Sequence, residues 1–73
     1  MPSRADLFWR QSQTLFERWE TLLTHESRLV RRESALYRKW LVAFDPTDED
    51  SALIRDVLLE MLAELMVDAA LNE

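Results

Sequence analysis

Apolar residues return every seven positions through the first 44 residues of the chain. One series consists of Phe8, Leu15, Leu22, Leu29 and Leu36. A neighbouring series consists of Trp9, Phe16, Leu23, Val30, Tyr37 and Phe44. Seven residues are close to two turns of an α-helix, so both series lie along one helical face. The pattern predicts helical structure from about residue 4 to about residue 44.

Local signals mark both ends of this helical region. Ser3 is followed three residues later by Asp6, which resembles the capping box found at helix starts. At the other end, Pro46 disfavours helical backbone at the residue before it. We therefore expect the helical region to end near Phe44.

A second helix is expected from about residue 48 to about residue 71. Thr47 is its predicted N-cap, with Asp50 three positions later. One apolar stripe of this helix contains Ile54, Leu58, Met61, Leu62, Leu65 and Ala69. A second stripe contains Leu59, Ala63, Met66 and Ala70. Because the two stripes cover more than half of the circumference, this helix is expected to make contacts on at least two sides.

Two all-α architectures remain open, and they differ in whether the chain turns near Thr24-Ser27. The seven-residue phase does not slip there, as expected for one continuous helix of roughly 60 Å. That long helix would pack against the shorter one as an antiparallel hairpin, and two hairpins would dimerise into a bundle. In the alternative, Thr24 or Ser27 caps a new helix and the chain forms a three-helix bundle. The unbroken register favours the long helix.

The composition indicates one small domain that spans residues 1–73. Glycine and cysteine are absent and there is one histidine, so strand-and-turn folds, disulfides and a structural zinc site are not expected. Charged residues interrupt the most apolar stretch, 52–71, which argues against a membrane span. The N-terminal residues lack the pattern of a signal peptide. We therefore expect a cytoplasmic protein without a cofactor, a metal or a membrane partner.

The apolar residues exceed what a small helical fold can easily cover, and this surplus predicts a protein-binding function. The predicted partner-binding residues are Phe8, Trp9, Phe16, Trp19, Leu59, Met66 and Ala70. The expected partner is another protein, a second copy of this chain in a homodimer, or both. An adaptor, an assembly chaperone, a regulatory subunit and an inhibitor of a larger protein machine would all work in this way.

Charge is divided unequally along the chain. Residues 1–44 carry eight Arg or Lys and five Asp or Glu, a net charge of +3, whereas residues 45–73 carry one Arg and nine acids, a net charge of −8. We expect the acidic side chains of the second helix to complement basic ones of the first helical region or of a dimer mate. The alternative is a regulator that binds nucleic acid through a basic face. That face consists of Arg28, Arg31, Arg32, Arg38 and Lys39. A further alternative is an acidic surface that mimics nucleic acid.

Catalysis is not expected from this sequence. The lone His25 has no nucleophile system beside it, no glycine-rich loop is present to hold phosphate, and we expect no small-molecule substrate. Glu26 and Glu33 fall on the apolar face of the first helical region. Because a buried charge is costly unless it is paired, these carboxylates are expected at the edge of the core or paired with an arginine across an interface.

Overall fold

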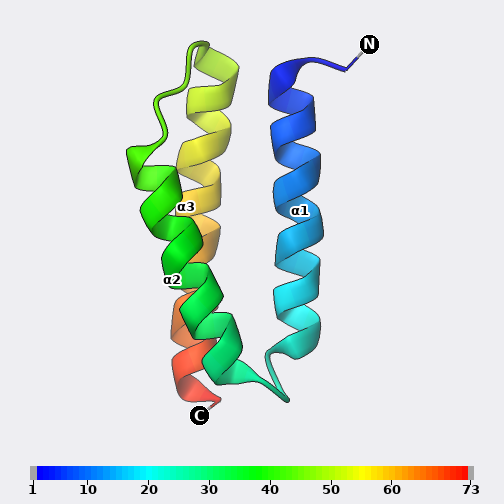
Figure 1. Cartoon of the computed structure of the whole chain (residues 1–73), viewed down its shortest axis with the longest axis vertical. Helices are drawn as coiled ribbons and strands as arrows, with labels where there is room; N and C mark the ends of the chain where they lie inside the picture. Colours follow the sequence, from blue (N-terminus) through cyan, green and yellow to red (C-terminus); the bar gives the residue numbers. More distant parts are fainter. Residues whose placement is uncertain (1, 73) are drawn as a thin grey trace.

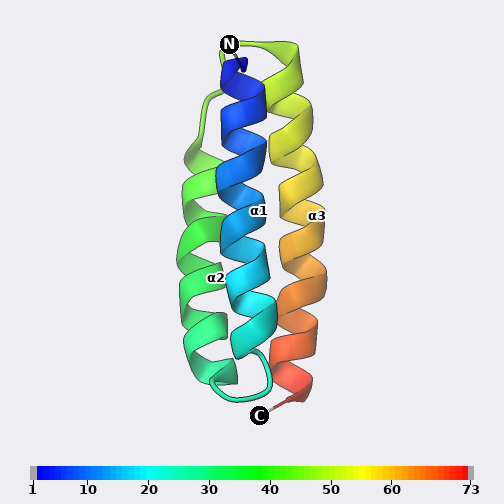
Figure 2. The ribbon, with the colours of Figure 1, turned by 90° about the vertical axis from the view of Figure 1, so that its right-hand side faces the viewer.

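The computed structural model describes residues 2–72 and contains three α-helices. They are α1 (Arg4–Leu22), α2 (Ser27–Ala43) and α3 (Glu49–Leu71). The helices lie side by side, with α1 and α3 running in one direction and α2 in the other (Figure 1 and Figure 2). Residues 2–72 contain no strand, which confirms the all-α prediction. Met1 and Glu73 of the predicted domain lie outside the described residues.

The prediction of one continuous helix from residue 4 to residue 44 is wrong, because the chain turns between α1 and α2. The backbone N–H groups of His25 and Glu26 both donate to the carbonyl oxygen of Leu22, at 3.0 and 2.7 Å. Glu26 is the N-cap of α2, so neither Thr24 nor Ser27 takes the predicted cap position. The chain therefore adopts the three-helix alternative, and dimerisation stays a prediction.

The connection between α2 and α3 agrees with the sequence to within one residue. The Phe44 backbone is extended and ends α2 where the proline signal predicts. The N-cap of α3 is Asp48, one residue after the predicted Thr47. Its carboxylate accepts hydrogen bonds from the N–H of Ser51 at 2.9 Å and from the Ser51 hydroxyl at 2.8 Å. Arg55 holds the connection in place by donating to the carbonyl oxygen of Phe44 at 3.2 Å.

The cap at Asp48 predicts a loss of stability in acid. The hydrogen bond from the Ser51 N–H, and then the bond from its hydroxyl, lower the pKa of the Asp48 carboxyl below its ordinary value. The folded state therefore gains stability from this carboxylate above the ordinary pKa, and loses it as the pH falls through the lowered pKa. Circular dichroism against pH is expected to show an acid unfolding step that shifts in Asp48→Asn. Asn still caps the helix, so the comparison tests the charge.

Asp45→Asn is the matched control, because Asp45 is an exposed carboxyl in the same connection and is outside the cap. Its acid profile is expected to follow that of the unmodified protein. Coinciding profiles for the unmodified protein and Asp48→Asn would contradict this account of the cap.

All three helices contribute to one hydrophobic core. Its buried members are Phe16, Trp19, Val30, Leu41, Leu58, Leu62, Leu65 and Ala69. Four of these belong to the first predicted stripe of α3, so that stripe forms the core side of the helix. Two small residues, Ser34 on α2 and Ala69 on α3, are completely buried. The helices α2 and α3 pack more extensively against each other than either of them packs against α1. Within residues 2–72, no helix has the length and apolar character that crossing a membrane requires.

Candidate functional site

The four predicted partner-binding residues of α1 separate into core and surface. Phe16 and Trp19 are buried, and their rings meet edge to face at 5.3 Å between centroids. They are therefore wrong as surface residues of the folded chain, because the turn after α1 brings α2 and α3 over their face of the helix. Phe8 and Trp9 are half-buried and pack at the margin of the core.

The three predicted residues of α3 lie apart from those of α1. Leu59 is half-buried against the core, and Met66 lines a cavity with side chains of α2. Ala70 is exposed one turn beyond Met66. The structure therefore does not gather the seven predicted residues into one surface.

A groove with aromatic walls opens between α1 and α2, and we call it the aromatic groove. Its cavity of about 130 Å³ is lined by Phe8, Gln11, Ser12, Leu15, Tyr37 and Trp40. Trp40 is 50% exposed, although its ring stacks on Tyr37 with centroids 5.6 Å apart. The rings of Phe8 and Phe44 also lie within 6 Å of it, at 5.9 and 5.2 Å. These contacts hold a large aromatic side chain in a defined position at the surface.

The aromatic groove contains an uncharged hydroxyl pair. The hydroxyl oxygens of Ser12 and Tyr37 lie 2.5 Å apart and share a hydrogen bond between α1 and α2. Burial raises the pKa of the Tyr37 phenol, and the hydrogen bond shared with Ser12 opposes part of that rise. The phenol therefore stays protonated in neutral solution, and the groove offers a partner mainly apolar surface.

One turn beyond Leu15, an ion pair joins α1 to α2. Arg18 donates from Nη1 to Oε2 of Glu33 at 3.1 Å and from Nη2 to Oε1 at 3.2 Å. The indole N–H of the buried Trp19 donates to the same Oε2 at 2.8 Å. Glu33 thus lies at the edge of the core, as its place on the apolar face predicts, and the arginine that it meets belongs to the same chain. Glu26 is exposed at the start of α2.

Sequence reasoning missed Trp40, which lines the α2 side of the aromatic groove, and the exposed Leu36 next to it on the helix. In the sequence, Trp40 and Leu36 belong to the same apolar face as the predicted core residues. Periodicity alone therefore does not distinguish these two exposed side chains from buried ones. Leu36 is 64% exposed and lies one turn before Trp40 on the same side of α2. The signal that could have found Trp40 is its position beside Tyr37 and Phe44 at helical spacing, close to the end of the helix.

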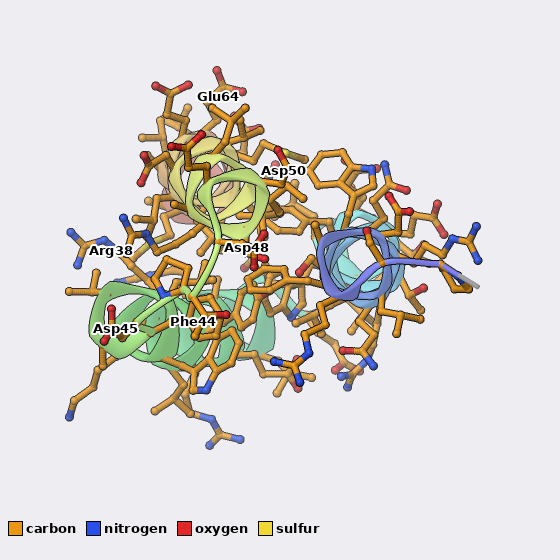
Figure 3. All side chains as sticks on the ribbon, turned by 90° about the horizontal axis from the view of Figure 1, so that it is seen from above. Arg38, Phe44, Asp45, Asp48, Asp50 and Glu64 are labelled. Carbon is orange, nitrogen blue, oxygen red and sulfur yellow. The ribbon has the colours of Figure 1, made fainter. Side chains whose placement is uncertain are left out.

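The five basic residues of the nucleic-acid alternative are all exposed on α2. Arg28, Arg31 and Arg32 line a shared cavity of about 380 Å³ with Ala35 and Met66. Figure 3 places Arg38 on the side of the bundle away from α1. The ion pairs Arg18–Glu33 and Arg55–Asp56 do not join this face to the acidic side chains of α3. Charge complementarity between α2 and α3, and nucleic-acid binding, therefore stay predictions.

The histidine and the carboxylates of the described chain are spread over its surface. His25 is exposed in the turn between α1 and α2. Within residues 2–72, no group of three or more histidine, aspartate and glutamate side chains is placed to hold a metal ion. Comparison of the chain with protein-family models, with curated proteins and with solved structures gives no match.

Proposed function

We propose that this protein is a non-catalytic helical interaction protein that holds an apolar segment of a partner protein in the aromatic groove. The half-exposed Trp40, held by three neighbouring rings, is the observation that carries the proposal. Tryptophan and tyrosine are enriched among the residues that contribute most to binding energy at protein interfaces. An adaptor, an assembly chaperone, a regulatory subunit or an inhibitor would use such a groove in the same way.

The groove is suited to anchor one side chain of the partner. A cavity of about 150 Å³ takes a benzene-sized group, and this one measures about 130 Å³. Its walls lie on two helices and its rings already touch one another, so binding costs little additional ordering of the protein. We therefore expect a leucine, methionine or phenylalanine of the partner to enter between Leu15 and Trp40.

The expected occupant is a different protein, and a second copy of this chain is the competing occupant. Light scattering over a series of concentrations distinguishes the two, because the average molar mass of a chain that forms homodimers increases with its concentration. A constant monomer mass supports the proposal. A dimer that Leu36→Ser dissociates would assign the groove to self-association instead.

Leu36→Ser is expected to weaken binding of the partner about tenfold, because an exposed apolar side chain one turn from Trp40 no longer leaves water on binding. The partner is first isolated by co-purification with the tagged protein and identified by mass spectrometry. Its affinity for the purified variants is then measured by isothermal titration calorimetry.

Leu53→Ser on α3 is the matched control, because Leu36 and Leu53 are both leucines that are 64% exposed. Both variants are expected to remain folded, since neither side chain belongs to the core. An equal loss of affinity in the two variants, or no loss in Leu36→Ser, would contradict the proposed function.

A further inference from the structure

A second apolar groove lies between α1 and α3, and we call it the acidic groove. Its cavity of about 310 Å³ is lined by Asp6, Trp9, Leu53, Ile54 and Val57. Its residues on α1 differ from those of the aromatic groove, and α1 separates the two. The protein therefore presents one groove on each flank of α1.

The walls of the acidic groove are apolar and open to solvent. Leu53 and Val57 are large exposed aliphatic residues on α3, and Trp9 and Ile54 are half-buried beside them. Exposed apolar surface with a polar rim is typical of binding sites. The groove thus provides the apolar half of a docking surface.

Carboxylates flank these walls at the end where α1 and α3 begin. The two helices run in the same direction, so their first turns lie at the same end of the bundle (Figure 1). Asp6 belongs to the first turn of α1 and Asp50 to the first turn of α3. Figure 3 shows Asp50 on the side of α3 that faces α1.

Further carboxylates continue the same faces toward the other end of the bundle. Glu64 and Asp68 follow Val57 by seven and eleven residues, which places them on its side of α3. Glu20 follows Trp9 by eleven residues on α1 in the same manner. Glu64 projects away from the bundle (Figure 3). The apolar walls are therefore bordered by negative charge at both ends.

Positive charge is scarce on α3. Arg55 is the one basic residue among residues 45–73. Its guanidinium donates to the carbonyl oxygen of Phe44 and to Asp56 instead of the acids around the groove. The flanking carboxylates of α3 consequently have no basic side chain of their own helix bound to them. On α1, Arg4 interacts electrostatically with Asp48, and the Asp6 carboxylate accepts a hydrogen bond from the Ser3 N–H.

We propose that the acidic groove binds a basic amphipathic helix of a partner protein. The apolar face of that helix packs on Trp9, Leu53 and Val57, and its lysines or arginines face the flanking carboxylates. Such a helix combines an apolar stripe with cationic edges, which is the pattern complementary to this groove. The site is independent of the aromatic groove, so the protein can bridge two partners held on opposite flanks of α1.

The test uses two synthetic amphipathic peptides of about four helical turns. One is built from leucine and lysine, and the other has glutamate in place of every lysine. Fluorescence anisotropy with the full chain is expected to give an affinity at least about tenfold higher for the lysine peptide at low salt. That affinity is expected to fall as the ionic strength rises.

Matched variants locate the binding site. Leu53→Ser is expected to weaken binding of the lysine peptide about tenfold, whereas Leu36→Ser leaves it unchanged. Asp50→Asn is expected to weaken it about two- to fivefold, and Asp45→Asn, which removes an equal charge far from α1 (Figure 3), has a smaller effect. Circular dichroism confirms that each variant is folded before binding is measured.

Three results would overturn the proposal. The first is equal affinity for the two peptides, and the second is a lysine peptide whose binding is insensitive to Leu53→Ser. The third is self-association at low salt that Leu53→Ser abolishes, which would identify the occupant as a second copy of the chain. A loss of partner binding in Leu36→Ser alone concerns the aromatic groove and leaves this proposal standing.

Discussion

Trp19→Ala is expected to unfold most of the protein. Trp19 is 1% exposed, and its ring meets those of Phe16 and Tyr37 edge to face at 5.3 and 5.6 Å between centroids. Removing a buried tryptophan costs about 3–5 kcal/mol, because the apolar contacts are lost and a cavity remains. A domain of this size rarely has more than about 3–5 kcal/mol of stability from one core. The two quantities are comparable, so the folded state should no longer dominate.

Urea unfolding followed by circular dichroism measures this effect. Trp40→Ala is the control, because Trp40 is also a tryptophan in contact with Tyr37 but is half exposed. It is expected to lose about 1–2 kcal/mol and to stay folded. A folded Trp19→Ala variant with nearly unchanged stability would mean that Trp19 is not core, and would revive its role as a contact residue.

Glu33→Ala is expected to lower the free energy of unfolding by about 2–3 kcal/mol. The carboxylate of Glu33 accepts the hydrogen bond of the buried Trp19 indole N–H and also pairs with Arg18. Removing it leaves a buried donor without its partner, which costs more than the bond itself contributes. The measurement is again urea unfolding, with the midpoint and slope compared between variants.

Two further variants separate the hydrogen bond from the ion pair. Arg18→Ala is expected to cost about 1 kcal/mol or less, because the Arg18 side chain is 54% exposed and water screens the pair. Glu33→Gln keeps an oxygen for the indole N–H and should cost about 1 kcal/mol. If Arg18→Ala were as destabilising as Glu33→Ala, the ion pair with Arg18, and not the hydrogen bond from the Trp19 indole, would be the main contribution of Glu33 to stability.

Much of the fold follows from local signals in the sequence. Ser3 and Asp6 form the predicted capping box, in which each side chain accepts a hydrogen bond from the backbone N–H of the other. Pro46 ends α2 near Phe44, and the start of α3 differs from the prediction by one residue. These features depend on neighbouring residues only, and therefore the sequence of the single chain suffices to predict them.

The turn between α1 and α2 could not be predicted from the periodicity. Leu22 and Leu29 are seven residues apart whether or not the intervening chain is helical. The residues before and after the turn face the same core, so the apolar phase is preserved across it. The chain also makes this turn without glycine, and no residue among 2–72 has a positive φ. The usual marker of a helix end is therefore missing.

The sequence predicted that apolar binding surfaces exist, but it predicted only some of the residues that form them. The excess of apolar residues predicted exposed large side chains, and those that the structure exposes include Leu36 and Leu53, which the prediction did not name as surface residues. The prediction placed much of that excess at Phe16 and Trp19, which the folded chain buries. Once the turn brings α2 against α1, the exposed apolar surface moves to the margins of the helix contacts, where Trp40 and Leu53 lie.

The sequence by itself determined that the chain is helical, where α1 begins, where α2 ends, and which stripe of α3 forms the core. Helix propensity, capping and proline chemistry act over a few residues and need no tertiary contacts. Only the tertiary structure decided which of two similar aromatic residues is core and which is surface. Trp19 and Trp40 share one apolar face in the sequence, and their burial differs because it depends on which helices pack over each of them.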